Sequence, residues 1–209
     1  MSIRARVIVE LGALAVGASL FLVVVPRRPI LVDLALALFA LSLVAMTAQD
    51  TRDHVWGVPP RPFAERARHS TRHLSIATAA VLALFAAWRI ARGGPLVTPG
   101  FVAALIAFVP WAYLQQALFQ FYLLGRVRAL VGNVPSLVVA VVNGLLFGVL
   151  HLPDWALVAV TIVAGGVWSW YYLHDRYLTP IALSHAVLGT AYFYWFRGHE
   201  LAGRWFGGW

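Results

Sequence analysis

Long apolar runs recur along almost the whole of this 209-residue chain, and they constrain its fold more than any other feature. About 20 residues of helix cross the roughly 30 Å hydrocarbon core of a bilayer. The chain is 61% hydrophobic and only 11% charged, which is more apolar than a soluble domain of this size needs. The runs therefore predict an all-α polytopic membrane bundle of about seven transmembrane helices. We place these helices at residues 7–25, 30–48, 74–90, 101–124, 135–151, 155–173 and 178–196.

The runs leave little chain outside the predicted bundle, so we expect one membrane domain over residues 1–209. Residues 1–92 are expected to form an N-terminal three-helix part, and residues 101–196 a second part that acts as the core. The one extended polar stretch, residues 49–73, contains three prolines and is predicted to be a surface loop. Its second half, residues 63–73, is alternatively a short amphipathic helix that lies on the membrane.

Charge and cysteine content exclude several function classes. The chain has 16 basic and 8 acidic residues, a formal net charge of +8, but the basic residues stand at the ends of the apolar runs. They indicate topology and lipid-headgroup anchoring and not nucleic-acid binding. Their distribution predicts a cytoplasmic N-terminus. We expect an integral protein of a prokaryotic cytoplasmic membrane. The absence of cysteine excludes disulfides, thiolate catalysis and cysteine metal sites.

Three glutamines interrupt the run from residue 101 to residue 124. An amide in hydrocarbon costs several kcal/mol unless it finds a partner, so such side chains turn toward one another or toward a wet cavity. On an α-helix Gln116 and Gln120 share a face, while Gln115 is turned about 100° away. One amide is therefore predicted to face the lumen and another a neighbouring helix. Hydrogen bonding between helices is the structural alternative.

A second polar group closes the next run, where Asn143, Phe147 and His151 follow one another at intervals of four. Residues with this spacing lie along one stripe of a helix. Gly144 and Gly148 form a G-x-x-x-G pair, which allows close helix approach. A lone histidine at a helix end is often an interfacial residue, and that alternative stays open for His151.

His185 lies about two turns inside the last run, beside Ser184, where it cannot reach water by extending along the helix. Two imidazoles on different helices that face a glutamine pair could bind a metal, polarise a carbonyl or hold a water. Two histidines among neutral amides make a poor zinc site, so we expect no metal and no cofactor.

Acidic residues near helix ends have simpler explanations. Asp154 either orients the ring of His151 or caps the next helix, and capping is the preferred interpretation. Glu10 and Asp33 stand near the starts of the first two predicted helices. We interpret both as interfacial carboxylates close to arginine or to a helix N-terminus.

The order of these segments resembles the CPBP family, which includes CAAX prenyl proteases, bacteriocin-processing enzymes and Abi-type intramembrane proteins. In that family one helix carries Glu-Glu-x-x-x-Arg, a later helix Phe-x-x-x-His, and a third His-x-x-x-Asn or Asp. Phe147 and His151 fit the second motif, and His185 fits the start of the third, with Pro180 before it. The resemblance covers residues 101–196 and implies a CAAX-protease-like core there.

The chain departs from the family pattern at its polar positions. Gln115 and Gln116 stand where the paired glutamates would be, Gln120 where the arginine would be, and Gly189 where Asn or Asp would be. In the family one Glu is thought to activate the attacking water, and Gln cannot take that proton. Loss of a general base typically removes about 10² to 10⁴ in rate. Joint loss of Glu and Arg replaces a charged network by a neutral one and avoids an unpaired buried charge.

Three functions are compatible with these residues. The resemblance favours an intramembrane endopeptidase that cleaves a membrane-anchored or lipidated peptide near its C-terminus. The alternative is a catalytically inactive relative that binds a hydrophobic peptide or lipid as an immunity, scaffold or regulatory protein. An unrelated transporter or lipid-modifying protein is the third. The expected partners are the lipid bilayer and a hydrophobic or lipidated peptide, with no nucleic acid. The predicted catalytic residues are His151, His185, Gln115 and Gln116, and the predicted substrate-binding residues are Gln120, Phe147 and Asn143.

Overall fold

The computed structural model describes residue 5, residues 7–12 and residues 61–198. Every regular element in these ranges is a helix, which agrees with the predicted all-α class. Three helices are long and apolar enough to cross a membrane: Phe63–Ala91, Pro99–Val131 and Trp155–Asp175. This finding supports an integral membrane protein. The predicted helices at 7–25 and 30–48 lie outside the described residues except for residues 7–12, so the count of seven stays a prediction.

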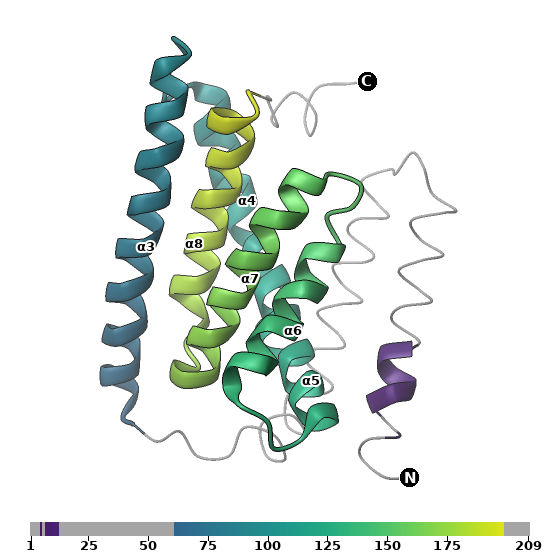
Figure 1. Ribbon diagram of the computed structural model, residues 1–209. Helices are drawn as coiled ribbons and strands as arrows, with labels where there is room; N and C mark the ends of the chain where they lie inside the picture. Colours follow the sequence, from purple (N-terminus) through teal and green to yellow (C-terminus); the bar gives the residue numbers. More distant parts are fainter. Residues whose placement is uncertain (1–4, 6, 13–60, 199–209) are drawn as a thin grey trace. The chain divides into compact units, whose positions relative to one another are not determined.

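The chain divides into two compact units, each described here by itself. One unit contains α3 (Phe63–Ala91), α4 (Pro99–Gln116), α8 (Leu178–Ala191) and the π-helix η3 (Tyr192–Phe196). In Figure 1 α8 runs between α3 and α4, and it packs against both of them.

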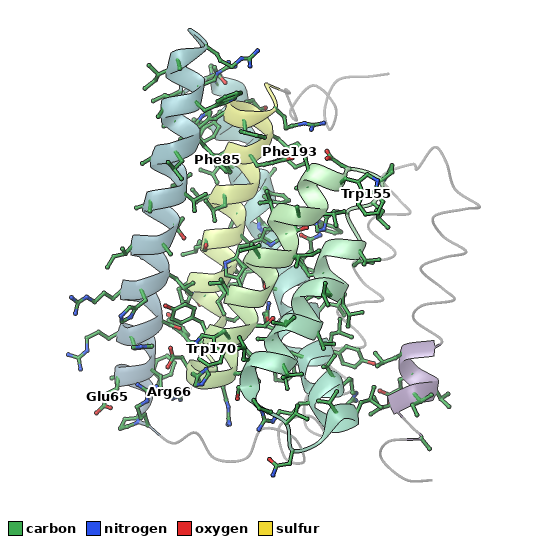
Figure 2. The ribbon with its side chains drawn as sticks, viewed as in Figure 1. Glu65, Arg66, Phe85, Trp155, Trp170 and Phe193 are labelled. Atoms are coloured by element: carbon green, nitrogen blue, oxygen red, sulfur yellow. The ribbon has the colours of Figure 1, made fainter. Side chains whose placement is uncertain are left out.

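Helix α3 begins at Phe63 and not at Leu74, so the second half of the predicted polar loop is helical. It continues directly into the apolar part of α3 instead of forming a separate helix. The reason is tertiary: Arg66 and Ser70 on its first two turns are buried against Asp175. Pro62 precedes the helix and no proline follows within it. Figure 2 shows Glu65 and Arg66 on the first turn of α3 and Phe85 near the opposite end.

The carboxylate of Asp175, the last residue of α7 (Trp155–Asp175), is buried and holds this first part of α3. Its oxygens accept hydrogen bonds from Arg61 at 3.3 Å and Ser70 at 3.1 Å, and one oxygen lies 2.6 Å from Nδ1 of His69. Arg66 donates to the backbone carbonyl of Asp175. A buried charge needs partners of this kind, and here polar residues outside the apolar window of α3 supply them.

The other unit contains η2 (Ala117–Leu123), α5 (Leu124–Val131), α6 (Ser136–Val149) and α7 (Trp155–Asp175) up to Leu173. Helices α6 and α7 approach closely because Gly144 faces the backbone of α7. A Cβ at Gly144 would lie 2.6 Å from the carbonyl oxygen of Ile162. The G-x-x-x-G prediction for Gly144 and Gly148 is therefore confirmed, since a Cβ at Gly148 would also meet Ile162.

Candidate functional site

The polar residues predicted to be functional are distributed over both units. Gln115, Gln116 and His185 lie in the unit of α3, α4 and α8, whereas His151 lies in the other. Gln120, Asn143 and Phe147 belong to the same unit as His151. We therefore describe two polar clusters, one in each unit.

The first cluster joins the last residue of α4 to the middle of α8. Nε2 of the Gln116 amide lies 3.0 Å from Nδ1 of the His185 ring. Gln116 is fully buried and His185 is only 6% exposed. A hydrogen bond that is shielded from water in this way fixes the orientation of both side chains.

This hydrogen bond also determines which nitrogen of His185 carries the ring hydrogen. The amide nitrogen of Gln116 can only donate, so Nδ1 of a neutral ring accepts. The hydrogen of the His185 ring then resides on Nε2. In this form His185 presents an N–H donor at Nε2, which suits stabilisation of a developing oxyanion and not removal of a proton.

Phe108 accounts for the glycine at position 189. Its ring meets the His185 ring edge-on, with centroids 5.4 Å apart. A Cβ at Gly189 would lie 2.6 Å from Cε1 of Phe108. The space that an Asn or Asp side chain would need is therefore occupied by an aromatic ring, and the departure from the family pattern at Gly189 has a packing cause.

The adjacent glutamine has an open hydrogen-bonding position. Oε1 of Gln115 is buried and accepts no hydrogen bond from the residues that the structure describes. An amide carbonyl in this state favours a donor such as water or a peptide N–H.

The second cluster, in the other unit, is centred on Ser169 of α7. The Ser169 hydroxyl lies 3.0 Å from Oε1 of Gln120 and 2.8 Å from the side-chain nitrogen of Asn143. All three residues are fully buried. Gln120 and Asn143 thus take part in a hydrogen-bonded network between helices, which was the structural alternative for the glutamines.

The change from α to π geometry at Ala117 separates Gln116 from Gln120. The prediction that these two residues share a face assumed an uninterrupted α-helix. A π-helix follows a different residue-to-residue rotation, and such segments are frequent at functional sites. The four-residue relation therefore does not apply over this stretch.

His151 occupies the turn after α6 rather than the last turn of the helix itself. Its Nδ1 lies 2.9 Å from the carbonyl oxygen of Phe147, and the two rings are 5.1 Å apart. A carbonyl oxygen can only accept, so Nδ1 carries the ring hydrogen and Nε2 keeps its lone pair. Burial lowers the pKa of His151 below its usual 6.5, partly offset by the Phe147 and Gly148 backbone groups and by Asp154.

Asp154 caps α7, as preferred from the sequence. Its Oδ1 accepts a hydrogen bond from the backbone N–H of Leu157 at 3.1 Å. Phe147 is almost fully buried and packs edge-on against Phe119 and Trp168. Among the described residues, no group of three or more His, Asp or Glu side chains is arranged to hold a metal ion.

Two polar groups of the structure were not predicted from the sequence. Ser169 stands between two tryptophans in an apolar run, and its isolation there was an available signal. The second is the buried Arg126, whose Nε donates to Glu10 at 2.8 Å, while the Tyr122 hydroxyl donates to the same oxygen at 3.2 Å. The prediction that Glu10 lies close to an arginine is therefore confirmed.

Comparison with known proteins agrees with the resemblance drawn from the motifs. Residues 97–191 match the model of the type II CAAX prenyl endopeptidase Rce1-like family. No curated protein matches this chain. No solved structure matches it either. The matched segment contains Gln115, Gln116, His151 and His185, and the match is consistent with a member of the CPBP family of CAAX-protease-like membrane proteins.

Proposed function

We propose that this protein is an intramembrane endopeptidase of the CAAX type, which cleaves a membrane-anchored or lipidated peptide near its C-terminus. The family match supports the kind of enzyme. The observation that carries the proposal is the buried hydrogen bond between Gln116 and His185, because it holds an imidazole as an N–H donor inside the family-matching segment.

The ring chemistry assigns a different role to each histidine. The Nε2 lone pair of His151 suits the role of a base that takes a proton from an attacking water and later passes it to the departing amine. The Nε2–H of His185 suits the role of an electrophile that donates to the oxyanion of a tetrahedral intermediate.

The amides have supporting roles in this mechanism. Gln116 keeps His185 in the donor form, and the open Oε1 of Gln115 accepts from the water or from the substrate backbone. Gln120 and Asn143 act on the substrate indirectly, through the Ser169 network that fixes their helices. Phe147 positions His151 through its carbonyl oxygen.

Cleavage of membrane-anchored peptides tests the proposal. The purified protein is reconstituted in liposomes with a set of such peptides, and products are identified by mass spectrometry. We expect slow cleavage, because an imidazole replaces the family's glutamate base. His151→Ala and His185→Ala should each reduce the rate by about 10² or more. His73→Ala, which changes an exposed histidine on α3, is the matched control.

The substitution Gln116→Glu distinguishes an active enzyme from a catalytically inactive relative. A carboxylate at this position accepts from Nδ1 of His185 and moves the ring hydrogen away from Nε2. If wild type cleaves and the variant loses activity, the neutral amide is required. If only the variant cleaves, or if neither does over a wide range of pH and metal conditions, the proposal fails. The chain is then an inactive family member that binds hydrophobic peptides or lipids.

A further inference from the structure

A small open pocket lies at the C-terminal end of α3, away from the polar cluster around Gln116. It is lined by Arg89 of α3, by the loop that leads to α4, and by the last residues of η3 and the turn after it. The loop and η3 are joined because the indole nitrogen of Trp195 donates to the carbonyl oxygen of Leu96 at 2.7 Å. All of these residues belong to one compact unit, and Figure 1 shows the C-terminal ends of α3 and α8 at the same end of it.

Arg89 is folded over this pocket instead of extending into solvent. Its Nε donates to the carbonyl oxygen of Pro95 at 3.2 Å. A Cβ at Gly94 would lie 2.1 Å from the same Nε, so the guanidinium passes directly across the face of that glycine. The glycine at this position is what allows the side chain to adopt its pose. Gly198, which has φ +68°, lines the pocket near Nη1 of Arg89.

The pocket offers hydrogen-bond donors and few acceptors. The two Nη groups of Arg89 donate to none of the residues that the structure describes, because the one recorded bond of this side chain is made by Nε. Thr98 accepts from the backbone N–H of Phe101 at 3.0 Å, and its own hydroxyl hydrogen has no acceptor in the described part of the chain. Groups of this kind match a ligand that carries several acceptor oxygens.

Electrostatics favour an anion at the same place. The carboxylates that the structure describes in this unit are Glu65 and Asp175, both at the other end of α3. At a rise of 1.5 Å per residue, Glu65 and Arg89 are separated by about 36 Å along the helix. This distance exceeds the Debye length of about 8 Å at physiological salt. No described carboxylate of this unit therefore compensates the charge of Arg89.

The position of the pocket indicates where the anion comes from. Arg89 is two residues from the end of a helix that is apolar and long enough to cross a membrane. Trp88 on the same turn and Trp195 beside the pocket are rings of the type that gather at the headgroup level. The planar guanidinium pairs with phosphate oxygens in a two-point geometry. We propose that this pocket binds a phosphate group at the membrane surface, supplied by an anionic phospholipid.

Native mass spectrometry of the full chain with phosphatidylglycerol tests the proposal. Arg89→Gln should weaken binding of one lipid molecule about tenfold or more, because a charged hydrogen-bonded contact is lost. Arg92→Gln is the matched control: it removes an equal charge three residues away, where the guanidinium lies 5.2 Å from the Trp88 ring centroid and is not among the groups that line this pocket. An equal loss of lipid binding in the two variants, or unchanged lipid binding in Arg89→Gln, would overturn the proposed site.

Two further arms keep the test decisive. Gly94→Ala keeps the charge but displaces the guanidinium, so it should weaken lipid binding as Arg89→Gln does; unchanged binding would contradict the assigned geometry. Arg89→Lys replaces Arg89→Gln if the latter does not fold. In lipid-free detergent, stabilisation by inorganic phosphate that is lost in Arg89→Gln would support the phosphate site and assign its ligand to solution instead of the lipid.

Discussion

His151 and His185 carry their ring hydrogens on different nitrogens, and the cause lies in one neighbour of each. A backbone carbonyl at Phe147 makes Nδ1 of His151 the donor, whereas the Gln116 amide makes Nδ1 of His185 the acceptor. Nε2 therefore offers a lone pair in His151 and an N–H donor in His185. This difference is the basis for the two roles, base and electrophile, that we propose for these rings.

The lowered pKa of His151 predicts a specific effect of pH on stability. Below about pH 6.5 the unfolded chain protonates this ring more readily than the folded chain does. The free energy of unfolding should therefore fall as pH decreases through 6.5, and this ring should have no effect above that pH. We expect the unfolding temperature to drop less in His151→Gln than in wild type between about pH 7.5 and about pH 5.5.

Thermal unfolding in detergent at the two pH values measures this difference. His73→Gln is the control, because His73 is exposed on the first turns of α3. A drop in unfolding temperature that is as small in His73→Gln as in His151→Gln would mean that the effect is not specific to position 151. A His151→Gln protein with an undiminished pH response would show that burial does not hold this ring neutral.

At the scale of elements, the contact between α6 and α7 depends on a backbone-to-backbone approach. Gly144 has the carbonyl of Ile162 and the amide of Gly166 within 2.7 Å of where its Cβ would be. Backbone atoms cannot move aside as a flexible side chain can. Gly144→Ala should therefore destabilise the protein by about 1 to 3 kcal/mol, as overpacking does.

Gly166→Ala is the matched control for this contact. A Cβ at Gly166 would meet its nearest neighbour, the carbonyl oxygen of Ala140, at an ordinary 3.8 Å. Alanine is the better helix former by about 1 kcal/mol, so this variant should be as stable as wild type or more so. Denaturant or thermal unfolding of both variants compares them, and equal stability would contradict the predicted close approach.

At the scale of the whole molecule, the membrane decides which exposed residues meet water. Arg72 and Ala80 are both exposed on α3, but only Ala80 lies in its apolar part. The chain has no native cysteine, so an introduced thiol is the sole site of labelling. In liposomes opened to both sides, Arg72→Cys should react with a charged maleimide, while Ala80→Cys should not.

Detergent denaturation provides the control for this labelling experiment. Once the chain is unfolded in sodium dodecyl sulfate, both thiols should react to the same extent. Fast labelling of Ala80→Cys in the intact membrane would mean that α3 does not cross the bilayer over its apolar part.

The sequence by itself determined the helical class, the membrane environment and the resemblance to the CPBP family. Run length, charge placement and motif spacing are properties of local chain segments, and they suffice for these conclusions. The ends of the helices at residues 135–151, 155–173 and 178–196 were predicted to within about two residues. The start of α3 was not predicted correctly, because its first turns are stabilised by Asp175, which is more than 100 residues away in the sequence.

Only the tertiary structure decided which partner each polar side chain has. The sequence placed Gln116 and Gln120 on one helix face, yet Gln116 binds His185 while Gln120 joins Ser169 and Asn143. From the sequence alone, Gly189 stands where the family has Asn or Asp. The structure shows that the ring of Phe108 occupies the space that such a side chain would need. Spacing along a helix fixes a face but not what packs against it, and hydrogen bonds between helices depend on that packing.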